Sequence, residues 1–170
     1  MWDISWSQEN SYQMIFQNAN ENAEAAFENG REEIENTLRF MKRMYGVVKE
    51  EGILVLEDYI YEIKGMSYET VLRDAMLLVV DGGELEPVME YLVNDYLIRE
   101  ENPVTTWIFL IYICSMRCLG EYRKKRLREY HAKENPELLK EMEEEPKEDA
   151  NIFFFWKEVI DIMPDHKIKV

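Results

Sequence analysis

The longest apolar run of the chain is VTTWIFLIYICSMRCL, which extends from Val104 to Leu119. It is shorter than the roughly 20 residues that a helix needs to cross a lipid bilayer. It also contains polar side chains, among them Thr105 and Arg117. We therefore predict that the run forms a buried helix. Contact with a membrane is an open alternative, because a basic cluster at residues 123–126 follows directly after it.

The start of this helix is marked by Asn102 and Pro103, since Asn is a favoured N-cap residue and Pro suits the first helical turn. We expect the helix to continue through the basic cluster to about His131. The same Asn-Pro pair recurs at positions 135 and 136. It opens a strongly acidic segment, residues 137–150, which is predicted to be a short exposed helix followed by a loop.

Upstream of the apolar run, apolar residues recur at alternating spacings of four and three and predict one long helix over residues 32–64. The series comprises Ile34, Leu38, Met41, Tyr45, Val48, Val55 and Tyr59. Gly52 lies within the series, where a missing side chain would let a neighbouring helix approach closely. A kink at Gly52 is the alternative. Asn29 and Gly30 predict a break before this helix.

Two further helices are expected between the long helix and the apolar run. Gly65 is predicted to close the long helix and Ser67 to cap the next one. That helix has a wide apolar face and should end at Gly82 and Gly83. Pro87 suits the first turn of the following helix. Its predicted inward face consists of Val88, Met89, Leu92 and Tyr96.

These patterns predict an all-α fold, a single domain over residues 1–170 with a bundle of about six helices. The chain contains only 7 Gly and 5 Pro, which favours long helices over many turns. No alternation of period two persists anywhere along it. At 46% hydrophobic content, 170 residues are enough to bury a core.

The charge of the chain restricts its partners. The formal net charge is -15. Proteins that bind nucleic acid normally carry a basic face that neutralises phosphates, so nucleic acid is excluded as a partner. An anionic membrane surface is disfavoured for the same reason. A protein partner remains compatible with this charge.

No pattern of catalytic chemistry stands out. Cys114 and Cys118 are four residues apart in the apolar run, which predicts two buried, reduced thiols rather than a metal site. The two His residues lie far from them in the sequence, and no phosphate-binding loop occurs. We therefore expect no cofactor, no metal and no enzymatic activity. The N-terminus lacks the features of a signal peptide, so a cytoplasmic location is expected.

The C-terminal segment, residues 151–170, is predicted to form an amphipathic helix and a tail. Four adjacent aromatic residues, Phe153 to Trp156, cannot all face one way on a helix. Phe154 and Trp156 are therefore candidate protein-binding residues, because exposed aromatic side chains are strong interface anchors. The alternative is that they complete the core of the domain.

Two segments upstream of the apolar run occur in a distinctive order. The first is KEEGILVLE, from Lys49 to Glu57, and the second is VLRDAMLLVVDG, from Val71 to Gly82. Together they resemble the cytoplasmic region of the flagellar motor stator A-subunit family. That family typically shows a basic residue, then Glu-Gly-Leu-Leu-x-Leu-Glu or a close variant, a short acidic spacer, and a Leu-Arg helix ending in Val-Val-Asp-Gly. The resemblance covers residues 44–96, under a third of the chain.

The resemblance implies contact with the torque-ring protein of the flagellar rotor. In the family, charged residues of the first segment face that ring, and by position Lys49 and Glu57 match its basic and acidic members. They are eight residues apart, about two turns of a helix, on roughly one side. Charges so placed would set the register of an interface. The alternative is that both are ordinary exposed charges.

Stator A-subunits have four membrane-spanning helices, two before this region and two after it. The first 43 residues here contain none, so the resemblance implies cytoplasmic helices without the ion channel. We therefore expect a non-enzymatic protein-binding domain. The alternative is a small acidic helical adaptor or regulatory protein unrelated to motility. A homo-oligomer, formed for example through the heptad-like series, is a further open alternative.

Overall fold

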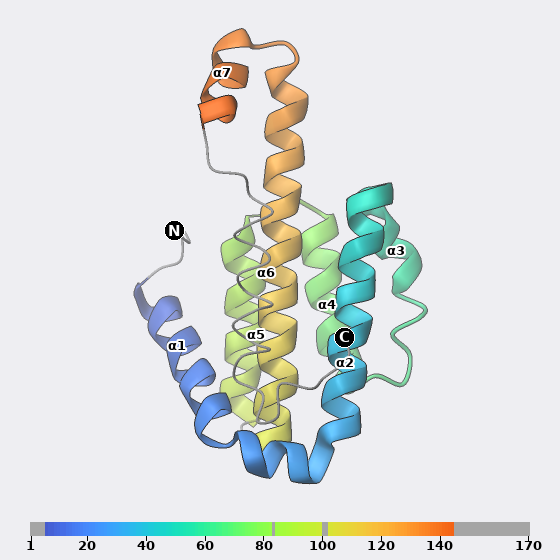
Figure 1. Cartoon of the computed structure of the whole chain (residues 1–170), viewed down its shortest axis with the longest axis vertical. Coiled ribbons are helices and arrows are strands. Elements are labelled where there is room, and N and C mark those ends of the chain that lie inside the picture. The colour runs from blue at the N-terminus through green and yellow to red at the C-terminus, as the bar shows by residue number, and fades with distance from the viewer. Residues whose placement is uncertain (1–5, 83, 100–101, 145–170) are drawn as a thin grey trace.

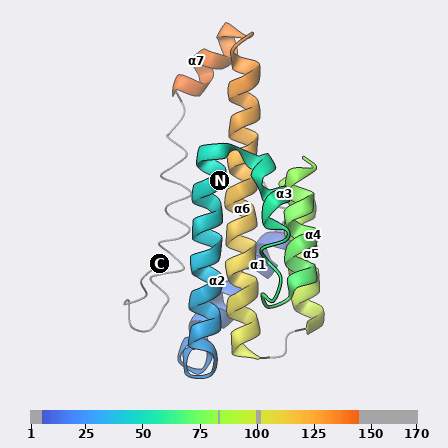
Figure 2. The ribbon, with the colours of Figure 1, turned by 90° about the vertical axis from the view of Figure 1, so that its right-hand side faces the viewer.

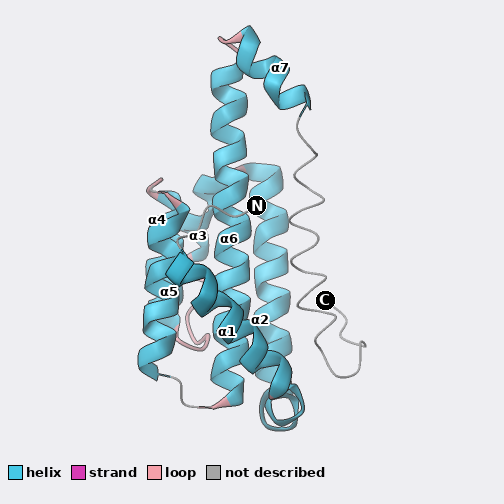
Figure 3. Cartoon of the chain, turned by 90° about the vertical axis from the view of Figure 1, so that its left-hand side faces the viewer, coloured by secondary structure: helices cyan, strands magenta, loops and turns pink. Residues whose placement is uncertain are grey.

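The computed structural model describes residues 6–82, 84–99 and 102–144 (Figure 1). These residues form seven α-helices and one 3₁₀ turn. In chain order they are α1 (Trp6–Glu21), α2 (Ala23–Glu51), η1 (Ile53–Val55), α3 (Leu56–Tyr59), α4 (Glu69–Val80), α5 (Leu85–Arg99), α6 (Pro103–Ala132) and α7 (Pro136–Glu144). No strand occurs over the described ranges, as Figure 3 shows. The predicted all-α helical bundle is confirmed.

The apolar helix α6 is the centre of the bundle. It lies between α2 on one side and the pair α4 and α5 on the other, as Figure 2 shows, and α1 also packs against it. Every residue from Thr105 to Leu119 is buried. A helix that is apolar around its whole circumference is stable only when neighbours cover every side. Each large apolar side chain buried in this way contributes roughly 1.5–3 kcal/mol.

Polar atoms of α6 fix the positions of its neighbours. The indole nitrogen Nε1 of Trp107 donates a hydrogen bond to the carbonyl oxygen of Ala19 on α1, at 2.9 Å. The Trp107 ring also meets the ring of Phe27 on α2 edge to face, with centroids 5.1 Å apart. The hydroxyl of Tyr112 donates to the carbonyl oxygen of Ser67, at 2.6 Å. The segment before α4 is thereby held against α6.

The predicted helix starts at the two Asn-Pro pairs are confirmed. The Asn102 side chain accepts a hydrogen bond from the backbone N–H of Thr105 at 3.0 Å, and α6 begins at Pro103. The Asn135 side chain accepts from the backbone N–H groups of Glu137 and Leu138, at 3.1 and 3.3 Å. In both cases the cap satisfies donors that have no partner within the helix.

The long helix predicted over residues 32–64 is wrong. The structure has α2 beginning at Ala23 and ending at Glu51. Gly52 has φ +98°, and no atom lies within 4 Å of the position where a Cβ would stand. Gly52 therefore ends the helix, because only glycine adopts a left-handed φ without a steric cost, and it is not a site of close approach. Beyond it, Leu56 and Ile63 are buried.

A close approach between helices occurs instead at Gly30. Its φ and ψ of −149° and 32° are non-helical, so α2 bends there without ending. The predicted break at Asn29 and Gly30 is therefore a kink. A Cβ added to Gly30 would lie 2.7 Å from both methyl groups of Val104 on α6. The missing side chain lets the first turn of α6 reach α2.

The ends of α4 agree with the sequence only in part. The prediction that Ser67 caps the helix is wrong, since the capping position is Tyr68, with the left-handed φ of 53°. The Ser67 hydroxyl instead donates a hydrogen bond to the Glu33 carboxylate on α2. The predicted end at Gly82 is confirmed, with φ +84°. The predicted inward face of α5 is also confirmed, because all four of its side chains are buried.

Candidate functional site

Two surface hollows, of about 400 and 410 Å³, meet at Glu33 on α2. The first is bounded by Tyr68 and the start of α6, and the second by residues 62–67. Arg43 and Glu62 form an ion pair of 3.5 Å beside the second hollow. Both side chains are exposed, so this pair contributes less than about 1 kcal/mol. In the second hollow the Ser67 hydroxyl is hydrogen-bonded to the Glu33 carboxylate, and no His or Cys is among the described residues that line either hollow.

Two tyrosine hydroxyls of the bundle, those of Tyr91 and Tyr112, act as hydrogen-bond donors. Burial raises the pKa of the Tyr112 hydroxyl, and the nearby Glu33 carboxylate adds to the effect. Burial, followed by a hydrogen bond to Asp74, raises the pKa of Tyr91 to about 12. Both groups therefore stay protonated at neutral pH, and the Tyr112 hydroxyl serves as a hydrogen-bond donor to the segment before α4.

The prediction that the two thiols of the apolar run are buried is confirmed. Cys114 and Cys118 are reduced thiols, and both are buried on α6. Burial raises the pKa of the Cys118 thiol well above its usual range, with the charge of Cys114 as a second cause. A thiol that stays protonated is a weak nucleophile and a weak metal ligand. Over residues 6–82, 84–99 and 102–144, no group of three or more His, Cys, Asp or Glu side chains converges on a metal position.

Lys49 and Glu57 are both exposed, but they are not two turns apart on one helix. Lys49 lies in the last turn of α2, and Glu57 lies on α3, beyond the break at Gly52. The prediction that Lys49 and Glu57 lie on one side of a single helix is therefore wrong. The Lys49 carbonyl oxygen accepts a hydrogen bond from the hydroxyl of Tyr122 on α6, at 3.3 Å. Their role in binding stays a prediction. Phe154 and Trp156 lie outside the described residues.

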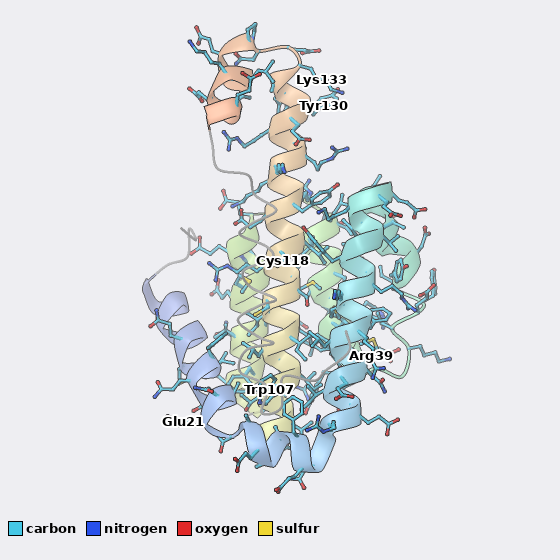
Figure 4. All side chains as sticks on the ribbon, in the orientation of Figure 1. Glu21, Arg39, Trp107, Cys118, Tyr130 and Lys133 are labelled. Carbon is cyan, nitrogen blue, oxygen red and sulfur yellow. The ribbon has the colours of Figure 1, made fainter. Side chains whose placement is uncertain are left out.

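The most distinctive surface is a projection at one end of the molecule. Beyond Tyr122, α6 leaves the bundle and continues to Ala132, and α7 folds back against it (Figure 1). We call residues 123–144 the arm. Its base is held in place, because the Arg123 guanidinium fills the space over Gly82 at the end of α4. Figure 4 labels Tyr130 and Lys133 near the tip.

The arm exposes large apolar side chains. Leu127 is 43% exposed, Tyr130 68% and Leu139 47%. Leu127 and Tyr130 are three residues apart on α6, so they lie on neighbouring positions of one face. Exposed aromatic and aliphatic groups that share a face are typical of protein contact sites.

The α6 part of the arm also concentrates positive charge, whereas the arm as a whole, residues 123–144, contains seven Lys and Arg residues and six Glu residues. Residues 123–133 contain six of the chain's 20 Lys and Arg residues and only one of its 35 Asp and Glu residues. Lys124 and Arg126 are exposed, and Arg126 forms an ion pair of 3.0 Å with Glu129. The basic and apolar groups share the same helical turns. The sequence signal for this surface was the basic cluster directly after the apolar run, but the sequence did not show that α6 outlasts the bundle.

The same helix meets the criteria of length and hydropathy for a membrane span, and 83% of its apolar window is buried by the rest of the described chain. The predicted buried helix is confirmed by that burial. Comparison with known proteins adds nothing to the geometry, because no family model, curated protein or solved structure matches this chain.

Proposed function

We propose that this chain is a non-enzymatic protein-binding domain and that the arm is its contact surface. The observation that carries the proposal is the exposure of Leu127 and Tyr130 among basic side chains on a helix that projects from the bundle. Apolar anchors provide most of the affinity in such surfaces, and the surrounding charges select the partner.

The partner proposed first is the torque-ring protein of a flagellar rotor. Its support is the resemblance of residues 44–96 to the stator cytoplasmic region. A second support is the position of Lys49, whose carbonyl accepts a hydrogen bond from Tyr122 at the base of the arm. Glu57 is exposed on α3, close after the end of α2 in the chain. Both side chains are exposed and are therefore accessible to a partner.

The second candidate is a helical adaptor or regulatory protein unrelated to motility. It is favoured by the burial of Thr105–Leu119 in the middle of the bundle, where a stator subunit would have a membrane span. In this case the same arm would bind a different partner. The two candidates differ in the identity of the protein that the arm captures.

A binding assay with the purified torque-ring protein separates the two candidates. We expect Leu127→Ser with Tyr130→Ser to abolish binding, and Lys49→Glu or Glu57→Lys to weaken it. Tyr61→Ser with Ile98→Ser is the matched control, since both residues are 84% exposed and lie outside the arm. If the torque-ring protein does not bind the wild-type chain, the rotor assignment fails. If the Leu127→Ser, Tyr130→Ser variant binds a partner as tightly as the wild-type chain does, the arm is not the contact surface.

A further inference from the structure

The end of the molecule opposite to the arm carries a charge of opposite sign to that of residues 123–133, the α6 part of the arm. Residues 21–35, around the junction of α1 and α2, contain six Glu residues and one Arg. We call this segment the acidic end. It lies at the bottom of Figure 1, whereas the arm lies at the top of the same long axis. Figure 4 labels Glu21 at this end.

The carboxylates of the acidic end face solvent. Glu24, Glu28 and Glu32 are all exposed and follow one another at spacings of four. Glu24 and Glu28 lie one helical turn apart before the kink at Gly30, where like charges repel one another by roughly 0.2–0.5 kcal/mol, so a basic partner would relieve the repulsion. The one basic residue, Arg31, is paired with Glu35 at 3.3 Å and lies over the ring of Phe27.

The two patches match in size and oppose in sign. Residues 21–35 hold six acidic residues against one basic residue, and residues 123–133 hold six basic against one acidic. Because they lie at opposite ends of one long axis, two copies placed antiparallel bring each arm beside the acidic end of the other copy. Both contacts are then identical, as a two-fold axis requires, and the pair is closed.

We propose that a second copy of this chain docks antiparallel, with each arm against the acidic end of its partner. The proposal goes beyond the proposed function and shares with it only the arm as a contact surface. Leu127 and Tyr130 would supply the apolar part of the contact. Lys124 and Arg126 would face Glu24 and Glu28, and Arg126 would share its charge between its own Glu129 and the partner's carboxylates.

The negative net charge of each copy does not prevent such a pair from forming. Each copy carries a formal charge of -15, but charges separated by more than about 8 Å are largely screened at physiological salt. Contacts of opposite sign at short range therefore decide the register. The helix α7 is itself acidic, so the attraction is confined to the α6 part of the arm.

Pairing through the heptad-like series is not available to the folded chain. Four of its members on α2, Ile34, Leu38, Met41 and Val48, are fully buried in the core to which α6 contributes. A dimer that used this series would have to open the bundle. The arm and the acidic end are in contrast both on the surface, so they can meet a second copy without unfolding either one.

The test reverses the charge of one patch at a time and measures self-association of the purified full chain by sedimentation equilibrium. The arm variant is Lys124→Glu with Arg126→Glu, and the end variant is Glu24→Lys with Glu28→Lys. Each alone should weaken the dimer by at least about tenfold, because both contacts in the pair become repulsive. An equimolar mixture of the two variants should recover the dimer, since arm and end are again opposite in both contacts.

The end variant also separates this mechanism from a general effect of net charge. It makes the chain less acidic, so a dimer limited by overall repulsion would become tighter rather than weaker. Lys42→Glu with Lys64→Glu is the control for the arm variant, because it changes the net charge equally at exposed positions of the bundle. It should dimerise more tightly than the arm variant.

Three results would overturn the proposal. They are a monomeric wild-type chain up to roughly millimolar concentration, a dimer that both variants leave intact, and a mixture that stays monomeric. Circular dichroism of each variant shows that it is folded before its association is measured. The measurement uses the purified chain alone, so it does not test whether a different protein binds the arm. The failure of self-association and the failure of the proposed function are thus distinguishable.

Discussion

The two halves of α6 belong to one continuous helix but lie in opposite environments. From Thr105 to Leu119 every side chain is buried under neighbouring helices, whereas beyond Tyr122 the helix projects and exposes Leu127 and Tyr130 (Figure 1). The backbone hydrogen bonding is the same in both halves. The difference therefore shows that side-chain type, and not helix formation, decides which part of this helix builds the fold and which part is free to bind.

The largest effect that would test this comparison comes from one aromatic side chain in each half. Trp107→Ala should lower the free energy of unfolding by about 3–5 kcal/mol, because it leaves a cavity and removes the hydrogen bond to Ala19. Tyr130→Ala on the arm should change it by less than about 0.5 kcal/mol. Urea unfolding followed by circular dichroism measures both. Equal losses in the two variants would show that the arm is part of the cooperative core.

A smaller effect is expected where the buried half begins. Gly30→Ala should destabilise the fold by about 1–3 kcal/mol, since its Cβ would overlap the methyl groups of Val104. Gly46→Ala is the matched control on the same helix. No atom lies within 4 Å of its Cβ position, so it should stabilise by about 0.5–1 kcal/mol. Thermal melts of both variants check the opposite signs, and adding Val104→Ala should restore part of the Gly30→Ala loss.

The smallest effect concerns the tyrosines of the buried region. Tyr112→Phe should cost about 1 kcal/mol at neutral pH, because the hydrogen bond to the Ser67 carbonyl is lost. Burial raises the folded-state pKa of Tyr112 above the unfolded value of 10.0, and that of Tyr91 to about 12. The folded chain then binds more protons than the unfolded chain above pH 10, so stability should fall between about pH 10 and 12.

Urea midpoints measured across this range check the direction. The fall should be shallower in Tyr112→Phe than in the wild-type chain. Tyr130→Phe, on the exposed arm, serves as the control and should leave the stability at neutral pH unchanged within about 0.5 kcal/mol. A wild-type chain that becomes more stable above pH 10 would contradict the assignment.

Local signals predicted much of the fold. The caps Asn102 and Asn135, the end of α4 at Gly82 and the inward face of α5 were all read from residues within a turn or two of each element. The errors lie where the outcome depended on a distant partner. The sequence alone did not distinguish a glycine that ends a helix, Gly52, from one that lets another helix approach, Gly30, because the answer depends on Val104.

The candidate site was predicted less well than the fold. The resemblance to the stator region indicates Lys49 and Glu57, and the expectation that they share one side of a continuous helix is wrong because the left-handed Gly52 interrupts that helix. In the sequence, only the basic cluster after the apolar run marks the arm. The arm is exposed because α6 continues beyond the ends of the helices that cover it. No local sequence pattern shows how far those neighbouring helices extend.

The sequence by itself determined that this protein is helical, where α6 and α7 start, and that the apolar part of α6 is buried, because these properties follow from caps and from side-chain hydrophobicity along one segment. It also determined that residues 21–35 are acidic and residues 123–133 basic. Only the tertiary structure decided that these two segments lie at opposite ends of one axis (Figure 1). The reason is physical: their separation is set by how α2 packs along α6, and packing depends on contacts between residues far apart in the chain.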